Sequence, residues 1–526
     1  MHLNSNTADH GAPSHGMSRK SVRQFIVYRA TLKRTTIALS ISVALSGCVV
    51  GPNFQAPEAP KTANGSELQS YTADRSSVTA ATPATAVGQG GVAQHILYGA
   101  DLPAQWWTLF HSPALDQLIK SALAQNPTLQ AAEASLRQAQ ENYNATTGTL
   151  TYPSVTGQLG ANRQRAAQGS TTPSVFNLYN ASVNVSYTLD LFGGSKRQLE
   201  GLNAAVDFQH YEVEAAYQTL IANVVTTAIK EASIRAQLQA TKDVLTAQQN
   251  QLNITQKQLA LGGVTKVVEL SQSTQVAQTQ ALVAPLEKAL AQTRHQLAVY
   301  VGKLPSESGL PEFELSSLQL PADLPISIPS ALVRQRPDIR ASEAVLHQAS
   351  AQVGVATANQ YPQITLTGSY GVDRLQLSNL SASSTLWSFG AGLTQPIFNA
   401  GALSAKRRAA VAGYDQAAAQ YRSTVLSAFQ NVADSLRAIQ SDADALSAQA
   451  QAAQLAQANL DLVTQQYRMG AVSYLVLLDA PRSYQQTKVN LVQAQAARYA
   501  DTAALYQALG GGWWVNPETV AVPAKP

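Results

Sequence analysis

The chain is poor in charged residues, in aromatic residues and in cysteine. Of its 526 residues, 13% are charged and 6% are aromatic. Cys48 is the only cysteine, so no disulfide can form within one chain. No stretch approaches the roughly 18 consecutive apolar residues that a membrane-spanning helix needs. If the protein crosses a membrane, it therefore does so with an element other than an α-helix.

The sequence also lacks the motifs of common catalytic, metal and nucleic-acid sites. Its eight histidines include three in the leader, and the other five have no metal-ligand spacing. There is no nucleophile elbow, P-loop or dinucleotide-binding turn. The formal net charge is +4, but residues 1–47 carry six basic residues and one acidic residue, so the remainder has a net charge of −1. We therefore expect no enzymatic activity, no cofactor, no metal and no nucleic-acid partner.

Residues 1–47 have the pattern of a signal peptide. A basic stretch at 19–34 precedes a short apolar run at 37–45. The run ends in Leu-Ser-Gly-Cys48, which resembles a bacterial lipobox, in which the cysteine receives an S-diacylglycerol and an N-palmitoyl group. The alternative is a buried free cysteine. Val49, rather than aspartate, follows the cysteine, which resembles lipoproteins sent on to the outer membrane.

The rest of the chain contains one pattern twice, about 208 residues apart. Each copy reads as helix, strand, strand, long helix and return helix. A duplicated unit of this size indicates two similar halves packed together. The matching positions are Tyr152-Pro153 and Tyr361-Pro362, Leu191-Phe192 and Ile397-Phe398, Gly262 and Gly470, and Val301-Gly302 and Leu509-Gly510.

Each copy holds two candidate strands. Apolar and polar residues alternate without a break over the twelve residues from Tyr179 to Asp190. The second copy alternates from Trp387 to Thr394, and weaker partner strands lie near Tyr152 and after Tyr361. A strand of this length with one apolar face and an aromatic residue near its end fits an outer-membrane barrel. The alternative is a soluble antiparallel sheet with one face in water.

Four strands per chain cannot close a barrel alone, because hydrocarbon does not tolerate open sheet edges. The chain must therefore pool its strands with copies of itself. Two copies give eight strands and a filled interior, whereas three copies give twelve strands and room for a lumen. A homotrimer is expected if the protein forms a pore.

Two helical segments are longer than those of ordinary globular domains. They run from about Ser195 to Leu259 and from about Leu403 to Tyr467. Some 65 residues at about 1.5 Å per residue give rods of roughly 100 Å. Leucines at seven-residue spacing, with similar spacing on the return segments, predict antiparallel coiled-coil pairing. The alternative, core helices of a bundle, conflicts with the length. In the first copy these leucines are Leu238, Leu245, Leu252 and Leu259.

The fold expected from these features is mainly α with a transmembrane β part, and it divides into six segments. Residues 1–47 form the signal peptide, 48–111 a lipid-anchored linker, 112–304 the first repeat, 305–330 a connector, 331–512 the second repeat, and 513–526 a tail. Met17 is an alternative start to Met1.

Four motifs occur in order along the mature chain. They are Cys48-Val-Val-Gly-Pro-Asn-Phe, Arg336-Pro-Asp-Ile, Gln395-Pro-Ile-Phe-Asn-Ala-Gly, and the segment from Tyr467 to Arg482. Together they resemble the TolC-like outer-membrane efflux proteins, in particular the lipoprotein (NodT/OprM-type) branch that serves tripartite drug-efflux systems. The resemblance implies a homotrimer with a 12-stranded barrel in the outer membrane, continued by a long antiparallel coiled-coil α-barrel in the periplasm.

The same resemblance implies the location and the partners. The location is the outer membrane of a Gram-negative bacterium, with a lipid anchor at Cys48 and a long periplasmic extension. The partners are outer-membrane lipid, a periplasmic adaptor (membrane fusion) protein and an inner-membrane pump of the resistance-nodulation-division type. The chain has no nucleotide or proton-relay site of its own, so the pump must supply the energy of transport.

The resemblance also implies a gate at the periplasmic helical tip. In similar proteins, positions matching Leu475 and Asp479 narrow the opening. Three copies of Asp479 around a three-fold axis make an anionic ring that favours cations. Arg468, Tyr474 and Arg482 are candidate latches between neighbouring helices, and the alternative for each arginine is a solvated helix end.

The expected function is the exit duct of a tripartite efflux pump, which conducts small molecules such as drugs passively across the periplasm and the outer membrane. Two alternatives stay open. One is a duct for type I protein secretion. The other is a non-pore structural lipoprotein of the envelope, which explains Cys48 and the heptads but gives the four strands no purpose.

Overall fold

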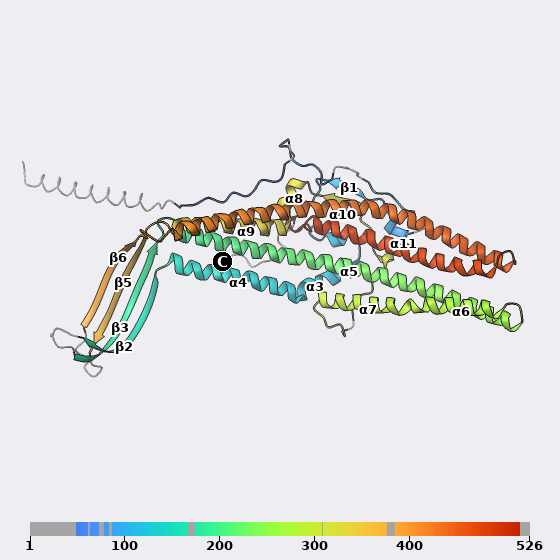
Figure 1. Cartoon of the computed structure of the whole chain (residues 1–526), viewed down its shortest axis with the longest axis horizontal. Coiled ribbons are helices and arrows are strands. Elements are labelled where there is room, and N and C mark those ends of the chain that lie inside the picture. Colours follow the sequence, from blue (N-terminus) through green and yellow to red (C-terminus); the bar gives the residue numbers. More distant parts are fainter. Residues whose placement is uncertain are drawn as a thin grey trace, which may run out of the picture. The chain divides into compact units, whose positions relative to one another are not determined.

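The computed structural model describes residues 49–61, 64–72, 78–83, 87–166, 174–307, 309–375 and 384–515 (Figure 1). These residues form two compact units. The first contains the described residues up to 52 together with 149–198 and 354–407, and the second contains 53–148, 199–353 and 408–515. Each unit therefore draws on both repeats. The predicted signal peptide and Cys48 lie outside the described residues.

The first unit is built on one antiparallel sheet of four strands. The strands are β2 (Ser154–Ala166), β3 (Ser174–Leu189), β5 (Gln363–Arg374) and β6 (Ser384–Thr394), in the order β2-β3-β5-β6. The central pairing of β3 with β5 joins the two repeats (Figure 1). Among the described strands, β2 and β6 each have one neighbour, so the sheet of a single chain has two open edges.

The register of the sheet places the apolar residues on one face. Val183 lies opposite Gly157 on one side and Tyr370 on the other, and Tyr370 lies opposite Trp387. The neighbouring row, one residue further along each strand, holds Ser182 and Gly371 and lies on the opposite face of the sheet. Since side chains alternate between faces in a strand, the alternation predicted from Tyr179 to Asp190 produces one apolar and one polar face over most of the sheet. The apolar face is exposed in the single chain, with 74% of Trp387 accessible.

Each repeat has one long helix as its main axis, and the two helices are equal in length. They are α5 (Gly194–Ala260) and α10 (Ala402–Arg468), and each has 67 residues. At about 1.5 Å per residue, each is about 100 Å long. The long helices predicted by the sequence are confirmed, with bounds that differ by about one residue at each end.

Shorter helices open each repeat. They are α3 (Pro113–Gln125) and α4 (Pro127–Thr151) in the first repeat, and α8 (Pro329–Gln335) and α9 (Pro337–Ala358) in the second. Proline begins α4 and α9 at the position where no intrahelical N–H bond is lost. The Arg336-Pro-Asp motif has a structural role, because the Arg336 guanidinium donates to both oxygens of Asp338 and to the carbonyl of Ala508 at the end of the return helix.

The two return helices differ. The second repeat has one return helix, α11 (Tyr474–Ala508), which continues through Pro481. The first repeat has two, α6 (Lys266–Ala281) and α7 (Val283–Tyr300), so the prediction of an unbroken return helix was wrong there. Pro285 accounts for the break, because a proline clashes with the carbonyl four residues earlier, and that residue is Ala281, the last of α6.

The segments outside the repeats also have regular structure. β1 (His95–Tyr98) and β4 (Asp323–Ile326) pair in parallel, and the described residues of these segments and of the stretch after α11 also hold four short 3₁₀ helices. Both strands and the residues at 102–110 and 313–320 pack in the main hydrophobic core of the second unit, where Trp106 and Phe110 meet Tyr506. Sequence reasoning treated these segments as linkers because strands of four residues carry no clear periodicity. The four helices are η1 (Gly88–Gly91), η2 (Trp106–Phe110), η3 (Leu315–Ser317) and η4 (Trp513–Val515).

A buried ion-pair cluster in the first repeat holds the connector. Glu231 is fully buried, and its Oε1 accepts hydrogen bonds from Arg235 at 2.6 Å and from Arg294 at 2.8 Å. Arg294 also donates to the carbonyls of Leu310 and Pro311 in the connector. Because each arginine bonds the same carboxylate, the buried charge of Glu231 is compensated.

The second repeat holds the N-terminal segment in a different way. Arg498 is fully buried and donates to the carbonyls of Gly90 and Val92 and to the hydroxyl of Thr79. The matching position in the first repeat is Leu290, which has no such donor. The two repeats therefore share their helical frame but differ in the segment that each one binds.

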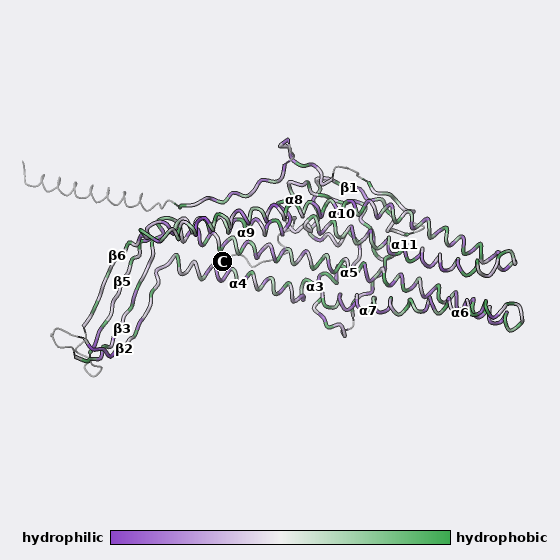
Figure 2. Tube along the Cα trace, viewed as in Figure 1, coloured by the Kyte–Doolittle hydropathy of each residue, from purple (hydrophilic) through white to green (hydrophobic). Residues whose placement is uncertain are grey.

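None of the described helices combines the length and the apolar character that a membrane-crossing helix requires. Figure 2 shows the reason, since hydrophilic and hydrophobic residues follow one another closely along α5 and α10.

Candidate functional site

The helical tip of each repeat turns at a glycine. Gly262 and Gly470 have φ values of 74° and 72°, in the left-handed region that favours glycine. The turns use the same two hydrogen bonds: Gly262 N–H to the carbonyl of Leu259, and Gly263 N–H to that of Gln258. In the second repeat Gly470 and Ala471 donate in the same way. This is the glycine C-cap that ends a helix and reverses the chain.

Tyr474 connects the tips of the two repeats. Its hydroxyl donates to Oε1 of Gln272 at 2.7 Å, and Gln272 in turn donates from Nε2 to the carbonyl of Gln248. The ring of Tyr474 packs edge-on against Tyr467, with 5.6 Å between centroids. The residue predicted as a latch therefore contacts the first repeat of its own chain. Gln272 was not singled out from the sequence, since a glutamine on a helix carries no signal of its partner.

The two arginines and Asp479 of the predicted tip residues have no partner within the described part of one chain. Arg468, Asp479 and Arg482 are exposed, and within the described residues they make no hydrogen bond or ion pair. Leu475 is the second residue of α11. The geometry therefore brings Tyr474 into the inter-repeat contact but leaves the two arginines and Asp479 available to groups outside the chain.

A cleft of about 400 Å³ lies beside the tip. Arg468 lines it from α10, while Leu477, Leu478 and Pro481 line it from α11. Proline lacks the N–H that would bond the carbonyl of Leu477, so one wall of the cleft has a backbone acceptor without its usual helical donor.

A second group of contacts lies in the first unit, where the chain leaves Cys48. Val50 N–H donates to the carbonyl of Phe192, and Arg197 donates to the carbonyls of Val50 and Gly51 at 3.3 Å each. Gly51 has a φ of 91°, and a Cβ there would lie 2.6 Å from the Cα of Gly354. The segment that follows the predicted lipid anchor is thus bound to the turn between β3 and α5.

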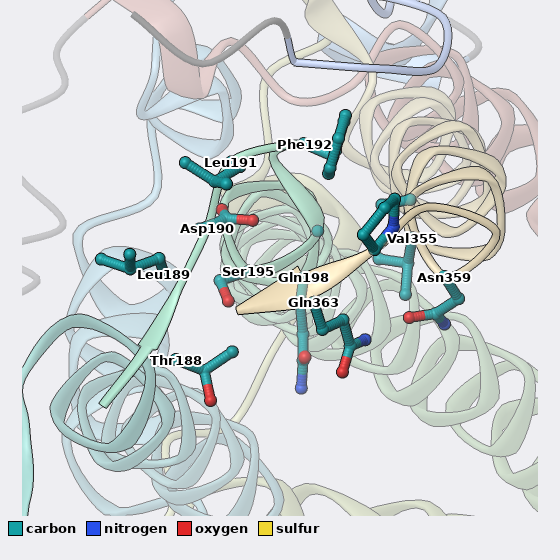
Figure 3. A pocket seen from close by; sticks show the side chains of 13 residues that line it. Thr188, Leu189, Asp190, Leu191, Phe192, Ser195, Gln198, Val355, Asn359 and Gln363 are labelled. Atoms are coloured by element: carbon teal, nitrogen blue, oxygen red, sulfur yellow. The ribbon is translucent and has the colours of Figure 1, made fainter. Parts of the chain in front are cut away.

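A small polar cavity of about 160 Å³ adjoins this turn. Figure 3 shows Gln198 and Gln363 close together within it, with Phe192 and Val355 on other sides. The one carboxylate in its lining, Asp190, accepts the N–H of Lys196 and so caps the first turn of α5. The cavity therefore serves the junction of strand and helix, and its lining does not form an acid-base pair.

Known proteins match this architecture. A family model described as "Outer membrane efflux protein" matches residues 118–303 and 328–511. The chain belongs to this family. Its resemblance to outer-membrane efflux proteins, its duplicated and mainly helical fold, and its location in the outer membrane with a periplasmic extension are thereby confirmed.

Individual relatives support the same assignment. The cation efflux system protein CusC of Escherichia coli is 31% identical over 480 residues, which cover 90% of this chain and 97% of CusC. The antibiotic efflux pump outer membrane protein ArpC of Pseudomonas putida is 30% identical over 490 residues, which cover 91% of this chain and 96% of ArpC. The solved outer-membrane channel OprN is similar with a TM-score of 0.76 and 27% identity, over 89% of this chain and 100% of that one.

Proposed function

We propose that this outer-membrane efflux protein works as a lipid-anchored homotrimer, the exit duct through which an inner-membrane pump and a periplasmic adaptor expel small molecules. The pump is of the resistance-nodulation-division type. The duct is passive and performs no chemical step. Its similarity to a cation efflux protein and to an antibiotic efflux protein supports a duct that discriminates little, with the pump selecting the compounds.

The single observation that carries the proposal is the four-stranded sheet with one apolar face and two open edges. Because the number of strands is even and all described pairs are antiparallel, β6 of one copy runs antiparallel to β2 of the next. Three copies then close twelve strands without a mismatched seam. Closure removes the edges that hydrocarbon does not tolerate, and it turns the polar face toward the lumen.

The gate of the duct lies at the helical tip. Asp479 is exposed on α11, and within the described residues it has no partner in its own chain. Around a three-fold axis, three such carboxylates form the narrow anionic ring, with Leu475 as its apolar neighbour. Arg468 and Arg482 hold the closed state by bonding a neighbouring copy, while Tyr474 ties the two hairpins within each copy.

The test is conductance of the purified protein in planar bilayers, together with export in cells. The trimer should conduct ions, and expression with its adaptor and pump should restore resistance to small toxic compounds in a strain that lacks its own duct. A protein that makes no channel is a structural lipoprotein. One that restores secretion of a protein substrate, but no resistance, serves type I secretion.

The lipid anchor is tested separately. Cys48→Ser should abolish labelling by radioactive palmitate, because no other cysteine or lipobox is present. Persistent labelling would reject the anchor while leaving the channel proposal intact.

A further inference from the structure

Three arginines lie on the apolar face of the sheet, near one end. Arg163 and Arg165 are on β2, and Arg374 is the last residue of β5. Counting alternate residues places Arg163 and Arg165 on the same face as Leu159. Tyr179 of the apolar face lies opposite Arg374 in the register, so Arg374 shares that face. All three are at the end of the sheet far from the start of α5.

Their depth corresponds to the edge of the membrane. The apolar face begins at the row of Leu189 and Ile364, and Tyr179 and Arg374 lie ten residues further along the same two strands. At about 3.4 Å per residue this distance is about 34 Å along the strand. With a strand tilt of about 40°, it spans about 26 Å along the membrane normal, close to the roughly 25 Å height of the apolar band of such barrels.

The pattern of the sheet changes beyond this row. Asn177, Arg163 and Arg165 occupy positions on the formerly apolar face, where Val175 is the one apolar residue of β2 or β3 beyond this row, whereas Phe176 and Leu178 of β3 occupy the opposite face. This exchange marks the level at which the strands leave hydrocarbon. Residues of this face at that level are at the depth of the headgroups rather than of the lipid tails.

The arginines have no acidic partner on this end of the chain. Within the described residues, none of the three makes a hydrogen bond or ion pair, and Nε of Arg374 is buried without a partner. Asp373 is the one acidic residue in the four strands, and its position in the register places it on the other face. The sequences that connect the strands, 167–173 and 376–383, contain no acidic residue. An anion that pairs with these arginines would therefore come from outside this part of the chain.

We propose that Arg163, Arg165 and Arg374 form a binding site for the phosphate groups of the outer-leaflet glycolipid, the phosphorylated lipid A of lipopolysaccharide. Guanidinium groups bind phosphate through paired, charge-assisted hydrogen bonds. The apolar residues below them, Leu159 and Tyr370 among these, are at the depth of the acyl chains. The site goes beyond the proposed transport function, and it requires only that the apolar face meets the membrane.

The direct test measures binding of lipid A to the purified trimer in detergent. We expect the combined R163Q, R165Q and R374Q variant to bind about 100-fold more weakly, at about fivefold for each charge removed. Lipid A without its phosphates should bind the unmodified protein as weakly as complete lipid A binds the triple variant. The matched control is K406Q, R407Q and R408Q, which removes the same charge from exposed residues of α10 and should leave the affinity unchanged.

Several outcomes would overturn the proposal. They are equal affinity in the sheet variant and the unmodified protein, an equal loss in the control variant, and equal binding of lipid A with and without phosphate. Competition by millimolar inorganic phosphate would instead identify a site for a free anion. Conductance and heat-modifiable migration establish that each variant forms a channel, so loss of the site is distinguished from loss of the duct.

If the triple variant does not assemble, R165Q alone provides the test. Arg165 is exposed and is the second-to-last residue of β2, so its replacement should not disturb the sheet. A loss of about fivefold is then expected, and an unchanged affinity would reject the site. Replacing all three arginines by lysine keeps the charge but removes the paired hydrogen bonds, so the affinity should lie between that of the unmodified protein and that of the glutamine variant.

Discussion

The guanidinium of Arg197 donates to the backbone carbonyl of Val50, two residues after the cysteine that is predicted to carry lipid. Arg197 lies in the first turn of α5, so the contact binds the start of the mature chain to the start of the first long helix. The backbone N–H of Val50 donates to the carbonyl of Phe192, which lies in the turn before that helix. The position of the anchor segment is therefore set by hydrogen bonds with the protein as well as by lipid.

Replacing Arg197 by alanine should release this segment. Loss of the two bonds to Val50 and Gly51, each contributing about 1 kcal/mol, should raise the hydrogen-exchange rate of the Val50 amide by about tenfold or more. Lys196→Ala is the control, because Lys196 is the exposed neighbour of Arg197. Equal exchange in the Arg197 variant and the unmodified protein would show that the arginine does not hold the segment.

Removing the hydroxyl of Tyr474 should loosen the tip. In Y474F the hydrogen bond to Gln272 is lost while the ring still packs on Tyr467. We expect a larger open fraction in single-channel recordings, from a loss of about 1 kcal/mol per chain. Y467F removes a hydroxyl from the partner ring and is the control. If both variants open to the same extent, the Tyr474 bond has no special role in closure.

Neutralising Asp479 should change ion selectivity. D479N removes three charges from the proposed ring, so the preference for cations should fall and conductance should change. D444N removes an exposed charge from the middle of α10 and should leave selectivity as it was. Reversal potentials under a salt gradient give the measurement, and an unaltered potential in D479N would place the residue outside the aperture.

Stability should decrease as pH rises, because of Glu214. Its side chain is 2% exposed and its Oε2 has no hydrogen-bond partner among the described residues. Burial raises the pKa of the Glu214 carboxyl to about 7 from an ordinary value of 4.5. The folded state therefore holds the proton more tightly than the unfolded state, and stability falls as pH rises from about 4.5 to 7.

E214Q removes this dependence. At pH 8 the free energy of unfolding of the variant should exceed that of the unmodified protein by at most about 3 kcal/mol per chain, so the variant should unfold at a higher temperature. At pH 4.5 the two should unfold at nearly the same temperature. Thermal unfolding of the detergent-solubilised trimer gives the measurement. E212Q, at an exposed position on the same helix, should have no effect at either pH. A pH profile that E214Q leaves unaltered would contradict the assignment.

The sequence was sufficient for the large elements because their patterns are long. The alternation around Val183 continues for twelve residues, and the register then aligns it with Tyr370 and Trp387. The equal lengths of α5 and α10 follow from the duplication. The break at Leu282 was missed although Pro285 signals it, because heptad spacing was followed across the proline.

Contacts between distant segments were beyond sequence reasoning. The partners of Arg197 are backbone carbonyls almost 150 residues earlier in the chain, and carbonyls have no sequence signature. The same holds for the Tyr474 bond to Gln272, which is 202 residues away. For the tip, sequence predicted Tyr474 as a contact residue, and only the structure supplied the group that it contacts.

The ion-pair cluster around Glu231 is present in only one of the two halves. At the matching positions the second half has Ile439, Ala443 and Thr502 in place of Glu231, Arg235 and Arg294. Recombination that copied one half over the other would remove the site for either the connector or the N-terminal segment. The two halves have the same helical frame, but neither could replace the other in the chain.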